Sequence, residues 1–164
     1  MANKVYYIMG VSGSGKTTIG ELLSKCLDIP FYDSDLFHPE ANIKKMSAGI
    51  PLNDEDRFPW LQAIHNFVVQ ELPSKSLIIA TSALKQKYRN ILVGQIDKDQ
   101  IQWIFLHGDF DLLQDRISKR KGHFMPESLL QSQFDTLEIP QHDVIQVEVS
   151  KTPEEIIEEI ISRI

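Results

Sequence analysis

The fold is decided by one stretch of the sequence, Gly10-Val11-Ser12-Gly13-Ser14-Gly15-Lys16-Thr17, which directly follows the apolar run Val5-Tyr6-Tyr7-Ile8-Met9. It fits the pattern G-x-x-x-x-G-K-[ST] between a strand and a helix, the context in which a phosphate-binding loop forms. Glycines let the backbone wrap around an anion with its N–H groups pointing inward, and the following helix adds its positive N-terminal end. Lys16 would reach the β- and γ-phosphates, and the Thr17 hydroxyl would bind Mg²⁺. The stretch therefore predicts a nucleotide phosphate site.

Length and composition are those of an ordinary globular chain. The 164 residues suffice for one well-buried core but not for two ordinary domains, so we expect a single domain over residues 1–164. The net charge of −6 argues against nucleic-acid binding and requires that local cations meet any anionic substrate. No signal peptide or bilayer-length apolar stretch is visible, so we expect a cytoplasmic protein without membrane contact. The single cysteine, Cys26, lies among leucines and is predicted to be a core residue.

Strand-like and helical runs alternate along the chain, which predicts an α/β fold with a mainly parallel sheet. We expect strands at residues 5–9, 31–32, 77–80, 101–106 and 144–149. We expect helices at residues 17–27, 39–49, 53–72, 85–93, 109–121 and 127–137, and a terminal helix capped by Thr152 and Glu155. Pro59 would lie either in the first turn of the third helix or at a kink in it.

Two aspartates follow the second expected strand, in Asp33-Ser34-Asp35. The carboxyl ends of parallel strands face the ligand crevice, so both side chains should point towards the phosphate loop. Their spacing of two puts them on one side if the strand geometry continues. One could hold Mg²⁺ and the other could accept the proton of an attacking hydroxyl, whereas the alternative is a solvated turn.

The expected strand at residues 77–80 ends in Thr81-Ser82. Proteins with a phosphate loop usually carry an aspartate for Mg²⁺ at this point. That role must then lie elsewhere, and Asp33 is the natural candidate.

Three cations in the middle of the chain are candidates for meeting an anionic substrate. Arg57, in an acidic run, is either part of an exposed salt bridge or a guanidinium that binds a carboxylate or phosphate. Lys85 and Arg89 are four residues apart, so they would share a helix face. That face would either hold an anionic group together or be simply solvated.

A second basic cluster begins at Arg116 and Arg120 and runs on through Lys121-Gly122-His123. Cations at a helix end are expected from the helix dipole alone. A phosphoryl-transfer site, however, also needs positive charge that closes over the γ-phosphate, and the glycine suits a mobile lid. Among the histidines, His38 beside the aspartates and His123 in this segment are the candidates for substrate contact.

Taken together, these residues resemble the gluconokinases, small phosphate-loop kinases related to shikimate kinases and nucleoside monophosphate kinases. The resemblance runs nearly end to end and is most specific in two blocks, P-L-N-D-x-D-R-x-P-W-L at residues 51–61 and S-A-L-K-x-x-Y-R at 82–89. It is also carried by Met9–Lys16, His38-Pro39 with residues 42–46, residues 120–125, and Gln133-Phe134 with Leu137-Glu138.

The resemblance implies ATP-dependent phosphorylation of D-gluconate at its terminal 6-hydroxyl, giving 6-phospho-D-gluconate and ADP. It also implies a three-layer fold with a five-stranded parallel sheet, a helical substrate-binding segment at about residues 35–72 and a lid at about residues 116–126. Members of the family are often homodimers, so we expect a homodimer.

The resemblance further assigns roles to individual positions. Catalysis would depend on Lys16, Asp35 and Arg120, and Mg²⁺ would be bound by Thr17 and Asp33. ATP would be held by Gly10, Val11, Ser12, Gly13, Ser14, Gly15, Lys16, Thr17, Thr18, Arg116 and Arg120. Gluconate would be bound by Asp35, His38, Arg57, Lys85, Arg89 and His123.

Three other functions compete with this interpretation. A kinase of another small hydroxy acid, such as shikimate, would normally show a glycine-rich turn where this chain has Ser82-Ala83-Leu84-Lys85. A GTP-dependent switch protein should carry an N-K-x-D motif, and the sequence has none. A non-catalytic module is disfavoured because Lys16, Thr17, Asp33 and the arginines are all present.

Overall fold

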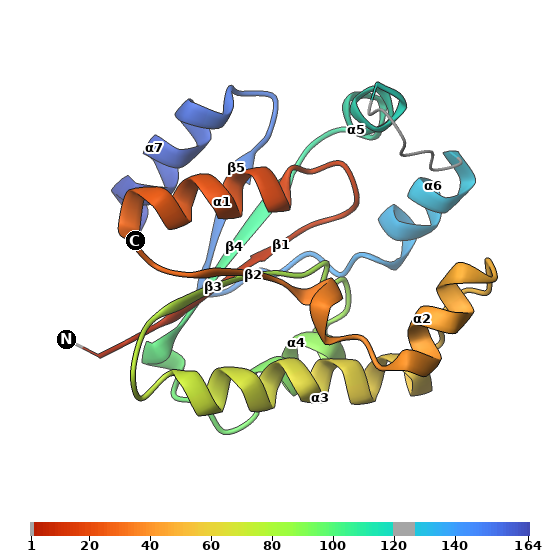
Figure 1. Ribbon diagram of the computed structural model, residues 1–164. Helices are drawn as coiled ribbons and strands as arrows, with labels where there is room; N and C mark the ends of the chain where they lie inside the picture. The colour runs from red at the N-terminus through yellow and green to blue at the C-terminus, as the bar shows by residue number, and fades with distance from the viewer. Residues whose placement is uncertain (1, 120–126) are drawn as a thin grey trace.

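In the computed structural model, five strands form one parallel sheet within residues 2–119 and 127–164, the part of the chain that the structure describes (Figure 1). The strands are β1 (Val5–Met9), β2 (Phe31–Asp33), β3 (Leu77–Ala80), β4 (Ile101–His107) and β5 (Val144–Glu148). They lie in the order β2-β3-β1-β4-β5, and each neighbouring pair is parallel. The predicted α/β class and the parallel sheet are confirmed.

The helices agree with the sequence prediction to within a few residues at their ends. They are α1 (Lys16–Leu27), α2 (Glu40–Ser47), α3 (Asp54–Glu71), α4 (Gln86–Val93), α5 (Phe110–Ser118), α6 (Glu127–Thr136) and α7 (Pro153–Arg163), with 3₁₀ turns η1 (Ser34–Phe37) and η2 (Lys98–Gln100). Pro39 is the N-cap of α2 and not its first residue, and Pro59 lies inside α3. The capping box of Thr152 and Glu155 is present. Within the described residues, none of these helices has the length and apolar character needed to cross a bilayer.

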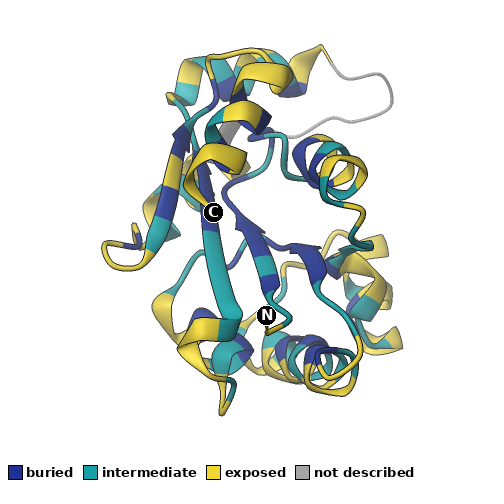
Figure 2. Ribbon diagram, turned by 90° about the vertical axis from the view of Figure 1, so that its left-hand side faces the viewer, coloured by how far each residue is buried: buried dark blue, intermediate teal, exposed yellow. Residues whose placement is uncertain are grey.

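The sheet buries both of its faces, because side chains of a strand alternate between them. Val5, Tyr7 and Met9 pack towards α3 and α4, whereas Ile8 packs towards α1 and α7. Figure 1 shows these helix pairs on opposite sides of the sheet, and Figure 2 shows buried residues concentrated along the strands. This gives three layers, and it leaves the carboxyl ends of the strands open for a site.

Helix α1 packs on the sheet through a face that includes Ile19, Gly20 and Leu23. A Cβ atom added at Gly20 would lie 2.2 Å from Cε1 of Phe31, so only glycine lets the helix approach β2 this closely. Leu23 is the last fully buried residue of the helix, Leu27 packs partly against the core, and Cys26 is exposed. The prediction that Cys26 is a core residue is therefore wrong.

We expect Gly20→Ala to destabilise the protein by about 1–3 kcal/mol, because overpacking at the Phe31 ring outweighs the gain in helix propensity of about 1 kcal/mol. Urea unfolding measures the change. In a Phe31→Leu background the penalty should shrink, because the ring that the new methyl group meets has been removed. An increase in stability on Gly20→Ala alone would contradict this packing.

Candidate functional site

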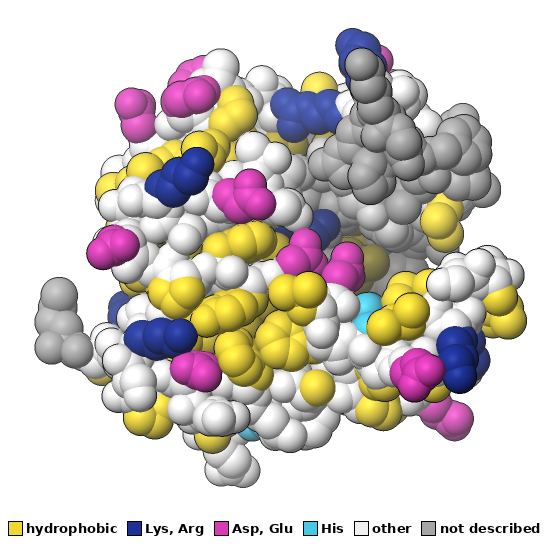
Figure 3. Space-filling view, in the orientation of Figure 1, with side chains coloured by type: hydrophobic (Ala, Val, Ile, Leu, Met, Phe, Trp, Pro, Cys, Tyr) yellow, Lys and Arg dark blue, Asp and Glu magenta, His cyan; other side chains and the backbone are white. Residues whose placement is uncertain are grey.

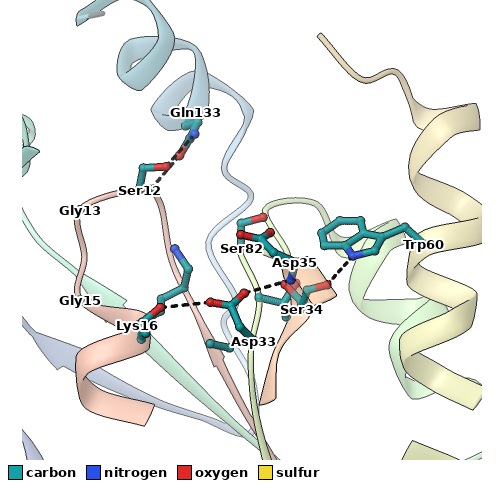
Figure 4. A pocket seen from close by; sticks show the side chains of 13 residues that line it. Ser12, Gly13, Gly15, Lys16, Asp33, Ser34, Asp35, Trp60, Ser82 and Gln133 are labelled. Atoms are coloured by element: carbon teal, nitrogen blue, oxygen red, sulfur yellow. Dashed lines mark hydrogen bonds between the residues drawn. The ribbon is translucent and has the colours of Figure 1, made fainter. Parts of the chain in front are cut away.

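A cavity of about 240 Å³ opens at the carboxyl ends of β1, β2 and β3. It is lined by the phosphate loop, the segment 33–35 after β2, the segment 80–82 around the end of β3, Trp60 of α3 and Gln133 of α6. Figure 3 shows acidic side chains beside a hollow in the middle of this face. The close-up in Figure 4 shows Lys16 and Asp33 on one side of the cavity, Gln133 above them and Trp60 on the opposite wall. The fold thus brings the loop and the aspartates together, as predicted.

The phosphate loop has the conformation that its glycines predict. Gly10 and Gly13 have φ angles of +152° and +82°. Both are also tightly enclosed, because an added Cβ would lie 2.6 Å from the Leu106 carbonyl oxygen at the first position and 2.8 Å from Cγ1 of Ile117 at the second. The Lys16 ammonium donates hydrogen bonds to the carbonyl oxygens of Gly10 and Val11, at 3.0 and 3.1 Å. The lysine side chain therefore lies within the curve of the loop and stabilises its backbone conformation.

The other predicted loop residues differ in their surroundings. Val11 and Ser14 are buried, and Thr18 is exposed in the first turn of α1. Thr18 does not line the cavity, and neither do Gly10, Val11 and Ser14.

Gln133 is a cavity residue for which no sequence pattern indicated a role. Its Oε1 accepts a hydrogen bond from the Ser12 backbone N–H at 2.8 Å, and its Nε2 donates to the Ser12 hydroxyl at 3.0 Å (Figure 4). The two residues are 121 positions apart, so no local pattern could reveal the contact. The side chain ties α6 to the phosphate loop.

Asp33 lies at the base of the cavity and accepts two hydrogen bonds from the described part of the chain. Its Oδ2 accepts a hydrogen bond from the Thr17 hydroxyl at 3.3 Å, and its Oδ1 accepts one from the Asp35 backbone N–H at 2.9 Å. The second bond caps η1, so the strand ends at Asp33 and the backbone turns there. The expectation that extended geometry aligns the two carboxylates does not hold, although both line the cavity.

The surroundings of Asp33 suit a magnesium ion. Thr17 and Asp33 present a hydroxyl and a carboxylate, the hard oxygen donors that Mg²⁺ prefers while it keeps several waters. Thr81 lines the same cavity, and its buried hydroxyl has no hydrogen-bond partner among the described residues. An unpaired buried hydroxyl at this point suits an ordered water next to such an ion. Residues 2–119 and 127–164 hold no cluster of three or more acidic, histidine or cysteine ligands that would bind a metal without help from a substrate.

The wall opposite the loop is held by Trp60, whose indole N–H donates to the Ser34 carbonyl oxygen at 2.8 Å. The bond fixes the turn that carries Asp35, whose carboxylate is exposed to the cavity. Desolvation at the cavity wall and the adjacent Asp33 carboxylate raise the pKa of the Asp35 carboxyl, whereas His38 and Lys16 act in the opposite direction. His38 stacks on the Trp60 ring, with centroids 4.3 Å apart.

Arg57 and Lys85 come together from α3 and from the start of α4. Both lie near Oδ1 of Asp54, at 3.8 Å and 3.7 Å respectively. Lys87, which no sequence pattern singled out, and Tyr88 donate hydrogen bonds to the same carboxylate. These two bonds are the main reason why the pKa of Asp54 falls to about 2. We call Arg57, Lys85 and Lys87 the cation cluster.

Arg89 does not belong to this cluster, and the predicted face shared with Lys85 is wrong. The side chain is buried, and its guanidinium donates to the carbonyl oxygens of Ala83 and Glu138 at 2.6 and 2.7 Å. Lys85 is the N-cap of α4, so it precedes the helix and points elsewhere. Ala83 has a φ angle of +45°, which is unfavourable for alanine. Arg89 therefore supports the loop after β3.

The predicted lid is only partly described. Arg116, on α5, is half-buried and donates a hydrogen bond to the Val149 carbonyl oxygen. Arg120 and His123 lie outside the described residues.

Comparison with known proteins places the chain in a family. Residues 12–164 match the family described as shikimate kinase. The chain is 41% identical to the thermoresistant gluconokinase of Escherichia coli (strain K12), over 93% of this chain and 89% of that protein. It is 43% identical to the gluconokinase of Gluconobacter oxydans (strain 621H), over 94% and 87% of the two chains.

Solved structures agree with the sequence matches. A gluconokinase from Sinorhizobium meliloti 1021 superposes with a TM-score of 0.86 at 41% identity, covering 97% of this chain and 90% of that one. A shikimate kinase from Aquifex aeolicus superposes with a TM-score of 0.57 at 21% identity, which supports only the shared fold. These relatives are more than 40% identical to the chain over nearly its full length, and the phosphate loop and both aspartates are in place. The chain therefore belongs to the gluconokinase family and is a kinase.

Proposed function

We propose that the protein transfers the γ-phosphoryl group of ATP to the 6-hydroxyl of D-gluconate, giving 6-phospho-D-gluconate and ADP. The observation that carries this proposal is that the phosphate loop and the exposed Asp35 carboxylate line one cavity. The identity of the acceptor is inferred from relatives that are named gluconokinase. Phosphorylation of another hydroxy acid, such as shikimate, is the alternative.

The reaction needs a donor site, an acceptor site and a base. The acceptor hydroxyl oxygen bonds to the γ-phosphorus, while the bond from that phosphorus to the β–γ bridging oxygen breaks. ADP keeps the electron pair of the broken bond, and the hydroxyl proton passes to a carboxylate oxygen of Asp35. Its raised pKa suits this role, because a very acidic carboxyl would be a poor base.

Positive charge would come from several sides. Lys16 and the loop N–H groups would bind the phosphates, and Mg²⁺ on Thr17 and Asp33 would neutralise part of their charge. Arg116 and Arg120 would serve the nucleotide from the lid at residues 116–126. The cation cluster would bind the gluconate carboxylate, with His38 and His123 near its hydroxyls.

The remaining expectations belong to the same proposal. One domain would carry the whole reaction, with residues 35–72 as the substrate-binding segment. The protein would act in the cytoplasm as a homodimer. Arg89 is left out of the substrate-binding set because the side chain is buried and both of its terminal NH₂ groups donate to backbone carbonyl oxygens.

We expect ATP- and Mg²⁺-dependent ADP release with D-gluconate, but not with shikimate, glycerate or nucleoside monophosphates. A coupled assay across these acceptors makes the test. Lys16→Ala should abolish turnover, and Asp35→Asn should reduce it by roughly 10²- to 10⁴-fold, the usual contribution of a general base. Turnover with shikimate and none with gluconate would overturn the proposal.

We expect Arg57→Ala to raise the KM for gluconate by roughly 10- to 100-fold, because a charged hydrogen bond contributes about 1.5–3 kcal/mol. The KM for ATP should not change. Arg163→Ala, which removes an exposed arginine paired with Glu159 on α7, is the matched control and should leave both constants unchanged. If Arg57→Ala left the KM for gluconate unaltered, the cation cluster would not be the carboxylate site.

We expect Gln133→Ala to raise the KM for ATP by roughly 30-fold at most, because two hydrogen bonds to Ser12, worth about 1 kcal/mol each, are lost. Gln133→Glu should be worse, since it adds negative charge beside the phosphates. Gln131→Ala is the control: this exposed residue on the same helix pairs only with Asp135 in the described structure. Equal effects of the two alanine variants would show that Gln133 does not hold the loop.

A further inference from the structure

His38 is held in one orientation by the residues around it. Its ring lies on the indole of Trp60, with an angle of 14° between the planes, and its side chain is only 5% exposed. Trp60 is itself fixed by its bond to the Ser34 carbonyl oxygen (Figure 4). His38 Nε2 lies 3.9 Å from Oδ1 of Asp35. The imidazole therefore presents one defined nitrogen to the proposed base.

Asn42 decides which nitrogen of His38 carries the proton. The Asn42 amide nitrogen lies 2.9 Å from the Asp56 carbonyl oxygen and 3.2 Å from His38 Nδ1. A backbone carbonyl only accepts hydrogen bonds, so the NH₂ group of Asn42 must face Asp56. The second hydrogen of the same group then points at His38 Nδ1, which must offer its lone pair. A neutral imidazole with Nδ1 unprotonated carries its proton on Nε2.

Asn42 is well placed to enforce this choice. It is 3% exposed, so breaking either of its bonds would leave a buried polar group without a partner. Burial lowers the pKa of His38; the Asp35 carboxylate opposes this shift, and the positive charge of Arg57 adds to it. The neutral ring is the form that fits, since a protonated Nδ1 would face the Asn42 donor.

We propose that Asn42 locks His38 in the Nε2–H tautomer, and that this imidazole is a positioning residue which orients the Asp35 carboxylate during phosphoryl transfer. The Nε2–H group faces Asp35 Oδ1, which leaves Oδ2 for the acceptor hydroxyl. The separation of 3.9 Å is long for a hydrogen bond, but such contacts often tighten only when substrates bind. The role in catalysis rests on the proposed function, whereas the tautomer does not.

Neutrality matters for this role. Asp35 also faces the Asp33 carboxylate and the Lys16 ammonium. A neutral N–H donor can hold one carboxylate oxygen in place without adding a second full positive charge beside Lys16. The arrangement thus orients Asp35 through a neutral donor.

The first test measures the tautomer directly in the unmodified protein. The imidazole ¹⁵N chemical shifts of His38, assigned by their loss in His38→Gln, should show a protonated Nε2 and an unprotonated Nδ1 at neutral pH. A proton on Nδ1, or a charged ring, would overturn the proposal. This readout does not depend on the substrate, so it stands even if the protein fails to phosphorylate gluconate.

The second test separates orientation of the base from binding of the substrate. His38→Ala should lower kcat by roughly 10- to 100-fold, the loss expected when a reacting group is misplaced by about 1 Å, and this change should exceed that in either KM. His38→Gln should recover most of kcat, because its amide nitrogen can reach the position of Nε2. His38→Asn, whose shorter side chain reaches only the position of Nδ1, should not.

A matched control is available in His65, a half-buried histidine on α3 whose Nδ1 lies 3.0 Å from the Leu92 carbonyl oxygen. His65→Gln should leave kcat unchanged, and thermal unfolding of all variants monitors folding. Two results would overturn the positioning role. One is His38→Gln being as slow as His38→Ala, and the other is a rise in the KM for gluconate without a loss of kcat.

Discussion

The pairing of β1 with β3 is the constraint on which the site depends. Its parallel register, with Ile8 opposite Ala80, continues past both strands. The Thr81 N–H donates to the Ile8 carbonyl oxygen at 2.9 Å, and the Gly10 N–H donates to that of Ser82 at 3.4 Å. On the other side of β3, Asp33 lies opposite Ala80. The ends of the three strands are therefore aligned. This alignment brings the phosphate loop, Asp33 and Thr81 to the cavity side by side, although they come from distant parts of the sequence.

Patterns that act over a few residues predicted most of the fold and the centre of the site. The glycine spacing identified the phosphate loop, and the position of Asp33 after a short strand placed it beside that loop. Contacts between distant residues were beyond such patterns. Gln133 reaches Ser12 across 121 positions, and Arg89 turns away from Lys85 because carbonyl oxygens on two different segments bind it. Helical spacing predicts which residues can lie next to each other, but it does not predict which group a long side chain will bind.

The cation cluster shows how an acidic chain keeps positive charge in one place. Asp54 holds Arg57, Lys85 and Lys87 around a single carboxylate, although they come from two elements. Such partly exposed ion pairs add little to folding stability. Their effect is to keep the side chains gathered before any ligand arrives, which reduces the ordering cost of binding an anion. An anionic ligand would thus bind to the same three cations that Asp54 already contacts.

The N-terminal half of α3 explains why one short block of sequence carries so much of the site. Asn53 and Asp56 form its capping box, which fixes where the helix begins. From that start, Asp54, Arg57 and Trp60 follow at intervals of three and lie along one side of the helix, and Trp60 is also the first of its buried residues, followed by Leu61. The same cap therefore sets the position of the cation cluster and of the indole that supports Ser34 and His38. A shift of one residue in the helix start would rotate all of them by about 100°, since there are 3.6 residues per turn. The cap is thus as much a part of the site as the side chains that line it.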